Sequence, residues 1–303
     1  MRIIYGILVL LSVFLTAPAY ALDTVKVADG IYAFVGEKHQ RSPTNLANNA
    51  TFGLIVTADG AVLVDPGGSW KGAEALHAAV RKVTDQPVRF VINSGGQDHR
   101  WLGSDYWKKQ GATIIASKAA VADHKERGSM QLTMLTQLLK GSLNGTNPVY
   151  ADVTFDISHK LSLGGLDIEI RHVGHAHTPG DSFVWVPSKK TVFSGDIVYV
   201  ERILGVGPQS NAKRWIAAFD AMAALKPEYI VPGHGGPTDL KRATAETRAY
   251  LVNLRTRIGA HIDAGGDMIG SVKVDQSAFK HLEQFEALAR RNAQQIFAEM
   301  EFE

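Results

Sequence analysis

The chain of 303 residues contains no cysteine. This absence excludes disulfide bonds and removes thiolates as metal ligands, so any bound metal must be held by histidine and carboxylate groups. An excess of charge of one sign is also missing, because 32 lysine and arginine residues face 30 aspartate and glutamate residues, a formal net charge of +2. Since no basic stripe or acidic tail stands out, we expect no nucleic-acid partner.

Long apolar runs are missing everywhere except at the N-terminus. Met1-Arg2 is a short basic start, residues 3–15 are mostly apolar, and Ala19-Tyr20-Ala21 has the small-residue pattern of a signal-peptide cleavage site. This order predicts a signal peptide over residues 1–21 and an exported, periplasmic protein. The alternative is an uncleaved membrane anchor, but the apolar run is short for a hydrocarbon core of about 30 Å. No membrane span is expected after it.

What the chain does contain is the composition of a globular protein, with 45% hydrophobic and 20% charged residues. Short runs rich in Val, Ile and Phe predict strands at 31–35, 52–56, 61–65, 88–93, 112–116, 166–173, 182–186, 191–194 and 229–231. Apolar residues at helical spacing predict helices over 72–83, 213–226 and 118–140, the last interrupted near Gly128.

The order of these elements repeats once as β–β–α–β. We therefore predict an α/β fold over residues 22–240, in which two sheets pack face to face with helices outside. Residues 241–303 show only helical periodicity and predict a C-terminal helical extension. That extension is expected to be a helical hairpin that covers the main domain, or alternatively a surface through which the chain forms an oligomer.

Polar residues follow the predicted strands on glycine-rich turns. Asp98 and His99 follow strand 88–93, His177 follows 166–173, Asp196 follows 191–194 and His234 follows 229–231. Each residue alone has an ordinary interpretation as a turn or surface residue. Their joint occurrence at strand ends, where a rigid scaffold positions loops, predicts a site for a divalent metal.

Together with the short sequence motifs around these residues, the chain resembles the metallo-β-lactamase superfamily over residues 24–236. The matching segments are 60–65, 91–93, 177–180, 193–196 and 231–235. Arg291-Asn292 in the last helix further resembles exported members associated with sulfur-oxidation and quinoprotein systems. The resemblance implies a four-layer αββα sandwich with the C-terminal helical extension added to it.

The metal-binding loop departs from the family pattern. Members of the family usually hold two metals, partly through an H-x-H-x-D-H loop, which here reads Ser-Gly-Gly-Gln-Asp-His at residues 94–99. Both leading histidines are absent. The resemblance therefore implies one zinc ion held by Asp98, His99, Asp196 and His234, with His177 as the remaining ligand of the lost site. His and carboxylate ligands do not exclude iron.

The resemblance also implies an activity, that of a mononuclear zinc hydrolase that cleaves an ester, thioester or amide bond, β-lactams included. Hydroxide would come from a water on the metal. Asp98 is expected to be catalytic as a ligand and His177 as the group that transfers protons. Arg100 and Arg202 are expected to bind a small anionic substrate, the alternative being that they play no part in binding. Asp65 is expected to accept a hydrogen bond from a ligand imidazole.

Two alternatives stay open at the level of the sequence. The first metal site could be rebuilt from His175, which lies two residues before His177, or from Gln97, which lies where a ligand could sit in the motif. The protein could also be a non-catalytic or redox, sulfur-related periplasmic accessory protein on the same fold.

Overall fold

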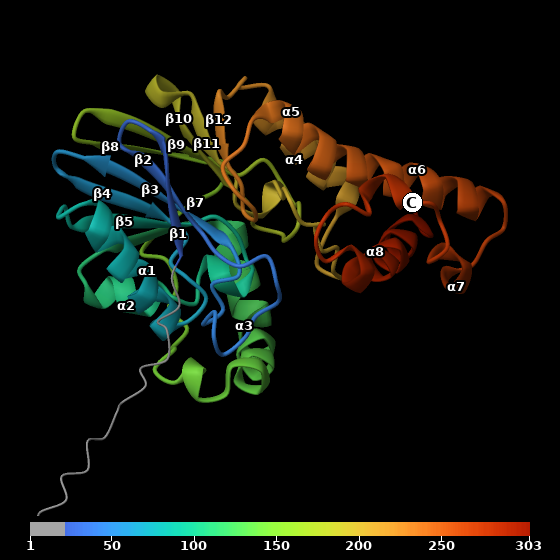
Figure 1. The fold of residues 1–303 in the computed structure, drawn as a ribbon, viewed down its shortest axis with the longest axis horizontal. Coiled ribbons are helices and arrows are strands. Elements are labelled where there is room, and N and C mark those ends of the chain that lie inside the picture. The colour runs from blue at the N-terminus through green and yellow to red at the C-terminus, as the bar shows by residue number, and fades with distance from the viewer. Residues whose placement is uncertain (1–21) are drawn as a thin grey trace, which may run out of the picture.

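The structure, a computed structural model, describes residues 22–303, so the predicted signal peptide at 1–21 lies outside the described residues. Two β-sheets pack against each other (Figure 1). The first has the order β1-β2-β3-β4-β5-β6-β7, with bounds Asp23–Ala28, Ile31–Val35, Thr51–Thr57, Gly60–Val64, Val88–Asn93, Thr113–Ser117 and Val153–Phe155. The second has the order β12-β11-β10-β9-β8, built from β8 (Ser158–Leu163), β9 (Leu166–Arg171), β10 (Phe183–Val186), β11 (Thr191–Phe193) and β12 (Tyr229–Val231).

The predicted fold class is confirmed, and all nine predicted strands are present with small shifts of their ends. Three further strands, β1, β7 and β8, were not predicted. β1 and β8 carry mostly exposed or half-buried side chains, so their sequences lack the apolar runs on which the prediction depended. β7 has only three residues.

The two sheets enclose an apolar core made of side chains from both. Ile55 and Val62 of the first sheet and Ile168 and Val184 of the second are fully buried in it. The close approach of the sheets requires a glycine at one position: a Cβ atom on Gly53 would lie 2.1 Å from Cδ1 of Phe193. This contact sets β3 of the first sheet directly against the end of β11 in the second.

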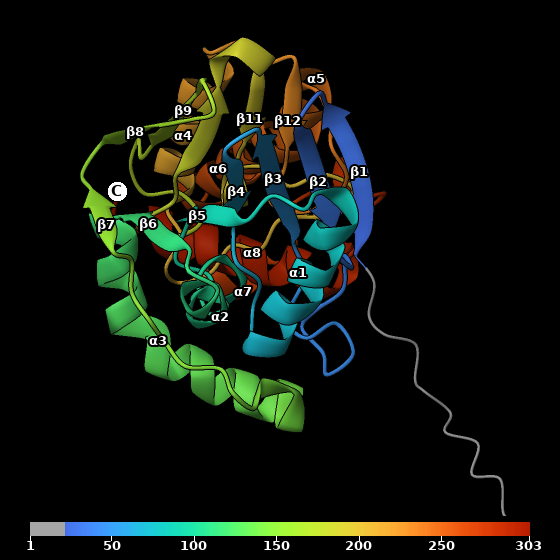
Figure 2. The ribbon, with the colours of Figure 1, turned by 90° about the vertical axis from the view of Figure 1, so that its left-hand side faces the viewer.

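Helices cover the outer faces. On the side of the first sheet lie α1 (Trp70–Val83), α2 (Ser104–Lys109) and α3 (Lys118–Leu139). In Figure 2, α1 lies in front of this sheet and the C-terminal helices lie behind it. The expected interruption near Gly128 is wrong, because α3 is continuous through it. The glycine there makes room for Trp101, whose ring would lie 3.1 Å from a Cβ atom.

The second sheet is covered by α4 (Ala212–Ala223) and by helices of the C-terminal segment. These are α5 (Leu240–Ala243), the π-helical turn Thr244–Arg248, α6 (Ala249–Asp263), α7 (Met268–Ser271) and α8 (Phe285–Met300). Trp215 of α4, Tyr250 and Leu254 of α6 and Ile296 of α8 belong to one buried cluster. The extension therefore packs on the main domain, which was the first of its two expected roles; the second was to form an oligomer. Within residues 22–303 we find no helix whose length and apolar content would let it cross a membrane.

Candidate metal centre

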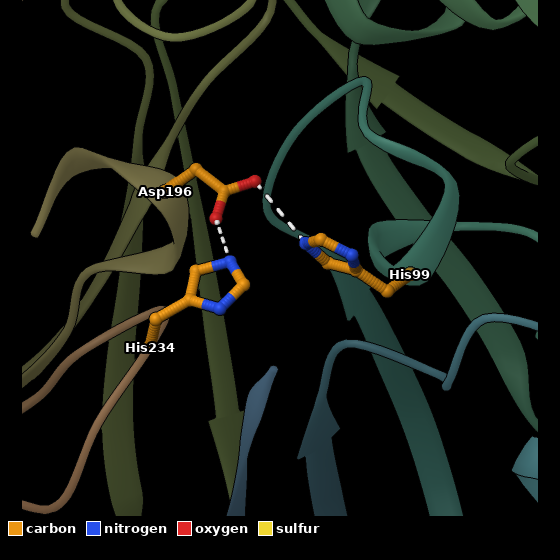
Figure 3. Close-up of side chains that lie close together, drawn as sticks. All are labelled: His99, Asp196 and His234. Carbon is orange, nitrogen blue, oxygen red and sulfur yellow. Dashed lines mark ion pairs between the residues drawn. The ribbon is translucent and has the colours of Figure 1, made fainter. Parts of the chain in front are cut away.

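Three potential metal ligands converge between the ends of the two sheets. His99 lies in the short 3₁₀ turn Asp98–Arg100 after β5, Asp196 in the turn Gly195–Ile197 after β11, and His234 in the loop after β12. One ligand atom from each lies within 4.8 Å of the others. His99 Nε2 is 3.4 Å from Asp196 Oδ2, and His234 Nε2 is 3.2 Å from Asp196 Oδ1 (Figure 3).

The chemistry of these three side chains fits a divalent cation. All three are buried, and His99 Nε2, His234 Nε2 and Asp196 Oδ2 have no hydrogen-bond partner within the described part of the chain. Buried polar atoms are nearly always partnered, so three unpartnered ligand atoms that face one another fit a divalent cation. Burial lowers the pKa of His99 to about 4 and that of His234 well below its usual value, which keeps both imidazoles neutral and able to ligate.

The carboxylate of Asp196 is kept ionised by a buried arginine. Burial alone would favour its neutral form, but Arg100 and the neighbouring imidazoles hold the pKa of Asp196 well below its usual range. Arg100 Nη2 donates to Asp196 Oδ1 at 2.7 Å, and Nη1 donates to Asp65 Oδ2 at 2.8 Å. Arg100 also donates to the carbonyls of Thr51 and Gly233. This guanidinium therefore orients the Asp196 carboxylate through its Oδ1 atom.

These contacts place two predicted site residues differently from the expectation. Arg100 is fully buried and does not line the pocket described below, so substrate does not reach it in this structure. Asp65 accepts hydrogen bonds from Arg100 and from the backbone and hydroxyl of Ser94, and not from a ligand imidazole. Burial raises the pKa of Asp65 to about 6 against the opposing charge of Arg100. Asp65 thus acts on Asp196 through Arg100.

Asp98 lies beside the three-residue group but does not belong to it. Its carboxylate accepts two hydrogen bonds from Arg41, a residue of the loop between β2 and β3. Arg41 Nε donates to Oδ2 at 2.6 Å, and Arg41 Nη2 donates to Oδ1. Burial opposes ionisation of Asp98, yet Arg41 lowers its pKa to about 2. Asp98 Oδ1 also lies 3.4 Å from His99 Nδ1. Direct ligation by Asp98 stays a prediction, and it would require Arg41 to release the carboxylate.

His177 lies in the loop between β9 and β10, buried beside the group. Its ring is 5.3 Å from that of Trp215 and 6.0 Å from that of Tyr199, measured between centroids. Nδ1 has no hydrogen-bond partner among the described residues, and burial lowers the pKa of His177 to about 4. His177 is thus a neutral imidazole with an open nitrogen next to the candidate centre.

At Gly96, the position of the second missing histidine, the space for a side chain is filled by α3. A Cβ atom on Gly96 would lie 1.6 Å from Asp123 Oδ2, and Arg127 holds that carboxylate through two hydrogen bonds. Of the residues considered for a rebuilt first site, His175 Nε2 contacts the carbonyl of Gln209 at 2.5 Å, and Gln97 contacts Asp98. Neither belongs to the three-residue group.

A cavity of about 110 Å³ opens over the centre. Its wall includes His99, His177 and His234 together with three arginines, and none of its lining residues is an aspartate or a glutamate. Arg41 comes from the loop before β3 and Arg202 from the segment after Asp196. Arg202 lines this pocket, where a substrate-binding residue is expected.

The comparisons with known proteins agree with this arrangement. The sequence model of the metallo-β-lactamase superfamily matches residues 47–234. The chain belongs to this superfamily. The match begins before β3 and ends on His234, so it contains all three residues of the candidate centre.

Individual relatives are distant. A linear primary-alkylsulfatase of a Pseudomonas species is 21% identical over 238 residues, which are 65% of this chain and 45% of the relative. A type 2 metallo-β-lactamase of Bacteroides fragilis is 30% identical over 98 residues, which are 30% of this chain and 39% of the relative. The alignments thus span less than half of these two curated relatives.

Solved structures show the same fold. A metallo-β-lactamase from Pontibacter korlensis superposes with a TM-score of 0.61 at 22% identity, covering 77% of this chain and 99% of its own. An inverting sec-alkylsulfatase from a Pseudomonas species superposes with a TM-score of 0.71 at 14% identity, covering 92% of this chain and 50% of its own. The larger share covered by the alkylsulfatase takes in the C-terminal helical extension.

Proposed function

We propose that the chain is a metal-dependent hydrolase that holds one zinc ion at His99, Asp196 and His234. Its substrate would be a small molecule with an ester, thioester or amide bond, β-lactams included. The observation that carries the proposal is the convergence of three buried, unpartnered ligand atoms inside the segment that matches the superfamily. A divalent metal there supplies a Lewis acid and brings the pKa of a water molecule towards ~7.

The chain's own side chains prepare this site. Arg100 keeps Asp196 ionised and fixes its orientation through Oδ1, which leaves Oδ2 for the cation. His99 Nδ1 lies 3.3 Å from Arg41 Nη2 and 3.4 Å from Asp98 Oδ1. The Arg41–Asp98 pair therefore contacts the ring nitrogen of His99 that does not face Asp196, and it positions this imidazole.

His177 is proposed to move the proton during hydrolysis. Its imidazole is neutral, lines the cavity and presents an unpartnered Nδ1. A neutral imidazole within reach of bound substrate can accept a proton from the attacking water and deliver it to the leaving group.

Elemental analysis of the purified protein tests the metal centre. We expect about one zinc per chain in the wild type, loss of the metal in Asp196→Ala and near-complete retention in His177→Ala. Two metals per chain would contradict the single-site proposal. Iron in protein purified from its native compartment would favour the redox alternative.

A kinetic experiment tests the reaction. Single-turnover hydrolysis of a panel of esters, thioesters and lactams is measured with protein loaded with one equivalent of zinc. We expect hydrolysis of at least one class, abolished in Asp196→Ala and slowed in His177→Ala at unchanged metal content. No hydrolysis of any member by the loaded wild type would contradict the proposal.

We also propose export to the periplasm, supported by the leader-like sequence of residues 1–21. N-terminal sequencing of the protein from a native extract checks this, with a mature terminus near Leu22 or Asp23 expected. A chain that retains Met1 and remains in the cytoplasmic fraction would contradict it.

A further inference from the structure

The cavity over the candidate centre contains a buried arginine that lacks a counter-ion. Arg202 is 4% exposed and lines the cavity. In residues 22–303 its Nε has no hydrogen-bond partner and no ion pair includes Arg202, whose guanidinium carbon lies 6.0 Å from the centroid of the Tyr199 ring. A buried charge without a partner is costly, so a chain that retains one usually provides for a partner from outside.

The nearby carboxylates are already occupied. Glu201 and Glu283 lie next to Arg202 along the backbone or across a β-bridge, but both accept Lys38 Nζ, at 3.1 and 2.8 Å. In the same cavity, Arg41 is neutralised by Asp98. The carboxylates of Glu201 and Glu283 are thus paired with Lys38, and that of Asp98 with Arg41. Arg202 is left without a carboxylate partner in residues 22–303.

The only polar contact of Arg202 within the described residues weakens when a metal binds. Arg202 Nη1 lies 3.4 Å from His234 Nδ1. When His234 ligates through Nε2, its Nδ1 carries a proton and can no longer accept from a guanidinium. The donors of Arg202 are then free for a group that enters the cavity.

A second arginine reaches the same cavity from the C-terminal extension. Arg291, an exposed residue of α8, lines the wall, and no ion pair is found for it in the part of the chain that the structure describes. The extension is fixed there because Ile203 N donates to Glu283 O and Glu283 N donates to Glu201 O, both at 2.9 Å. The positive charge of the cavity wall therefore comes from arginines of two separate segments, the loop after β11 and α8. None of the lining residues is an aspartate or a glutamate.

We propose that Arg202 and Arg291 form a binding site for an oxyanion group of the substrate, a carboxylate, sulfate or phosphate, next to the metal. This inference rests on the proposed function and names its substrate class. Guanidinium groups suit such anions because their N–H groups bond two oxygens at once. Since the metal removes the only polar contact of Arg202, the anion should bind more tightly to metal-loaded protein than to stripped protein.

Titration calorimetry with inorganic sulfate, inorganic phosphate and acetate tests the site without requiring turnover. Wild-type protein is measured with zinc and after removal of metal by a chelator. We expect binding of at least one probe, weakened about tenfold or more in Arg202→Met and several-fold in Arg291→Met. Arg214→Met is the matched control, because Arg214 is an exposed arginine of α4 without an ion pair among the described residues, and it should change affinity less than twofold. Equal affinities in wild type and Arg202→Met would overturn the proposal.

The melting temperature of the metal-free protein distinguishes a ligand-binding Arg202 from one that supports the fold. If Arg202 is kept for a ligand, Arg202→Met removes an uncompensated buried charge and leaves the melting temperature of the stripped protein unchanged or higher. A large decrease would show that Arg202 supports the fold and would overturn the assignment. Arg291→Met changes an exposed residue and is expected to fold normally.

Paired substrates distinguish the sources of the anion and separate this inference from the proposed function. Nitrophenyl acetate is neutral, nitrophenyl sulfate and phosphate carry the anion at the scissile bond, and a succinate monoester carries it at a distance. We expect KM for the preferred anionic ester to rise about tenfold in Arg202→Met, with KM for the neutral ester unchanged. Equal loss for neutral and anionic esters would refute the anion site and leave the hydrolase intact. Anion binding that depends on Arg202, with no hydrolysis, would refute the hydrolase and leave the anion site.

Discussion

Replacement of Gly96 by alanine tests whether α3 has closed the place of the second lost histidine. The added Cβ atom would lie 1.6 Å from Asp123 Oδ2, 2.7 Å from its Cγ and 3.0 Å from Arg127 Nη2. Asp123 cannot withdraw freely, because it is 3% exposed and held by Arg127, which also donates to the carbonyl of Gly96 at 3.2 Å. Overpacking of this kind costs about 1–3 kcal/mol. In a chain of this size, with an unfolding entropy of about 0.6 kcal/mol/K, that lowers the melting temperature by roughly 2–5 °C.

The assay is urea denaturation of metal-free protein, followed by circular dichroism, together with thermal melting. Gly141→Ala is the matched control, since nothing lies within 4 Å of its would-be Cβ and its φ is not positive. It should stay within about 0.5 kcal/mol of the wild type. The same crowding predicts that Ser94→His combined with Gly96→His still binds one metal and not two. Equal stability of the Gly96 and Gly141 variants, or a second metal in the double variant, would refute the reasoning.

Three further predictions concern charge and metal. Arg100→Met leaves the carboxylates of Asp65 and Asp196 buried without their cation and should cost about 3–5 kcal/mol of unfolding free energy, measured in urea; a loss below 1 kcal/mol would contradict the role given to Arg100. Burial lowers the pKa of His124 to about 4 from 6.5, and its Nε2 contacts the carbonyl of Gly95, so the neutral form stabilises the fold above pH 6.5 and this stability is lost as the pH falls towards 4. From pH 7.5 to 5 the wild type should therefore lose about 2 kcal/mol more than His124→Gln, which keeps a donor but does not titrate; equal pH dependence would contradict this. Zinc at 100 times its dissociation constant should raise the unfolding free energy by about 2.7 kcal/mol in the wild type and by nothing in Asp196→Asn; a similar increase in both would show that zinc binds elsewhere.

Much of the fold could be predicted from the sequence because its strands are apolar and end in glycine, proline or aspartate. The ends of β2, β5 and β12 were predicted to the residue. Strands β1 and β8 could not be found, since an edge strand needs few buried side chains and its exposed residues resemble those of a loop.

Three of the four predicted ligands were found together, whereas of the charged residues around them only Arg202 was predicted to line the pocket and does so. His99, Asp196 and His234 stand in short motifs whose spacing is fixed by strand ends, and the structure brings them together. Arg41 was not predicted, because an arginine in a loop has no local pattern and its pairing with Asp98 spans 57 positions. Arg100 was expected to bind substrate since it follows a ligand, but only the three-dimensional structure shows that its side chain turns into the protein.

The β-bridge between Arg202 and Glu283 has a consequence for how this molecule can change over evolutionary time. The candidate ligands lie in the sandwich, whereas part of the cavity wall is carried by α8, whose apolar face packs in the core but whose Arg291 is exposed. Changes at the exposed positions of α8 can therefore reshape the entrance without disturbing the candidate ligands. A designer who wished to alter the molecules that this protein admits could vary these exposed positions and keep the buried face of the helix.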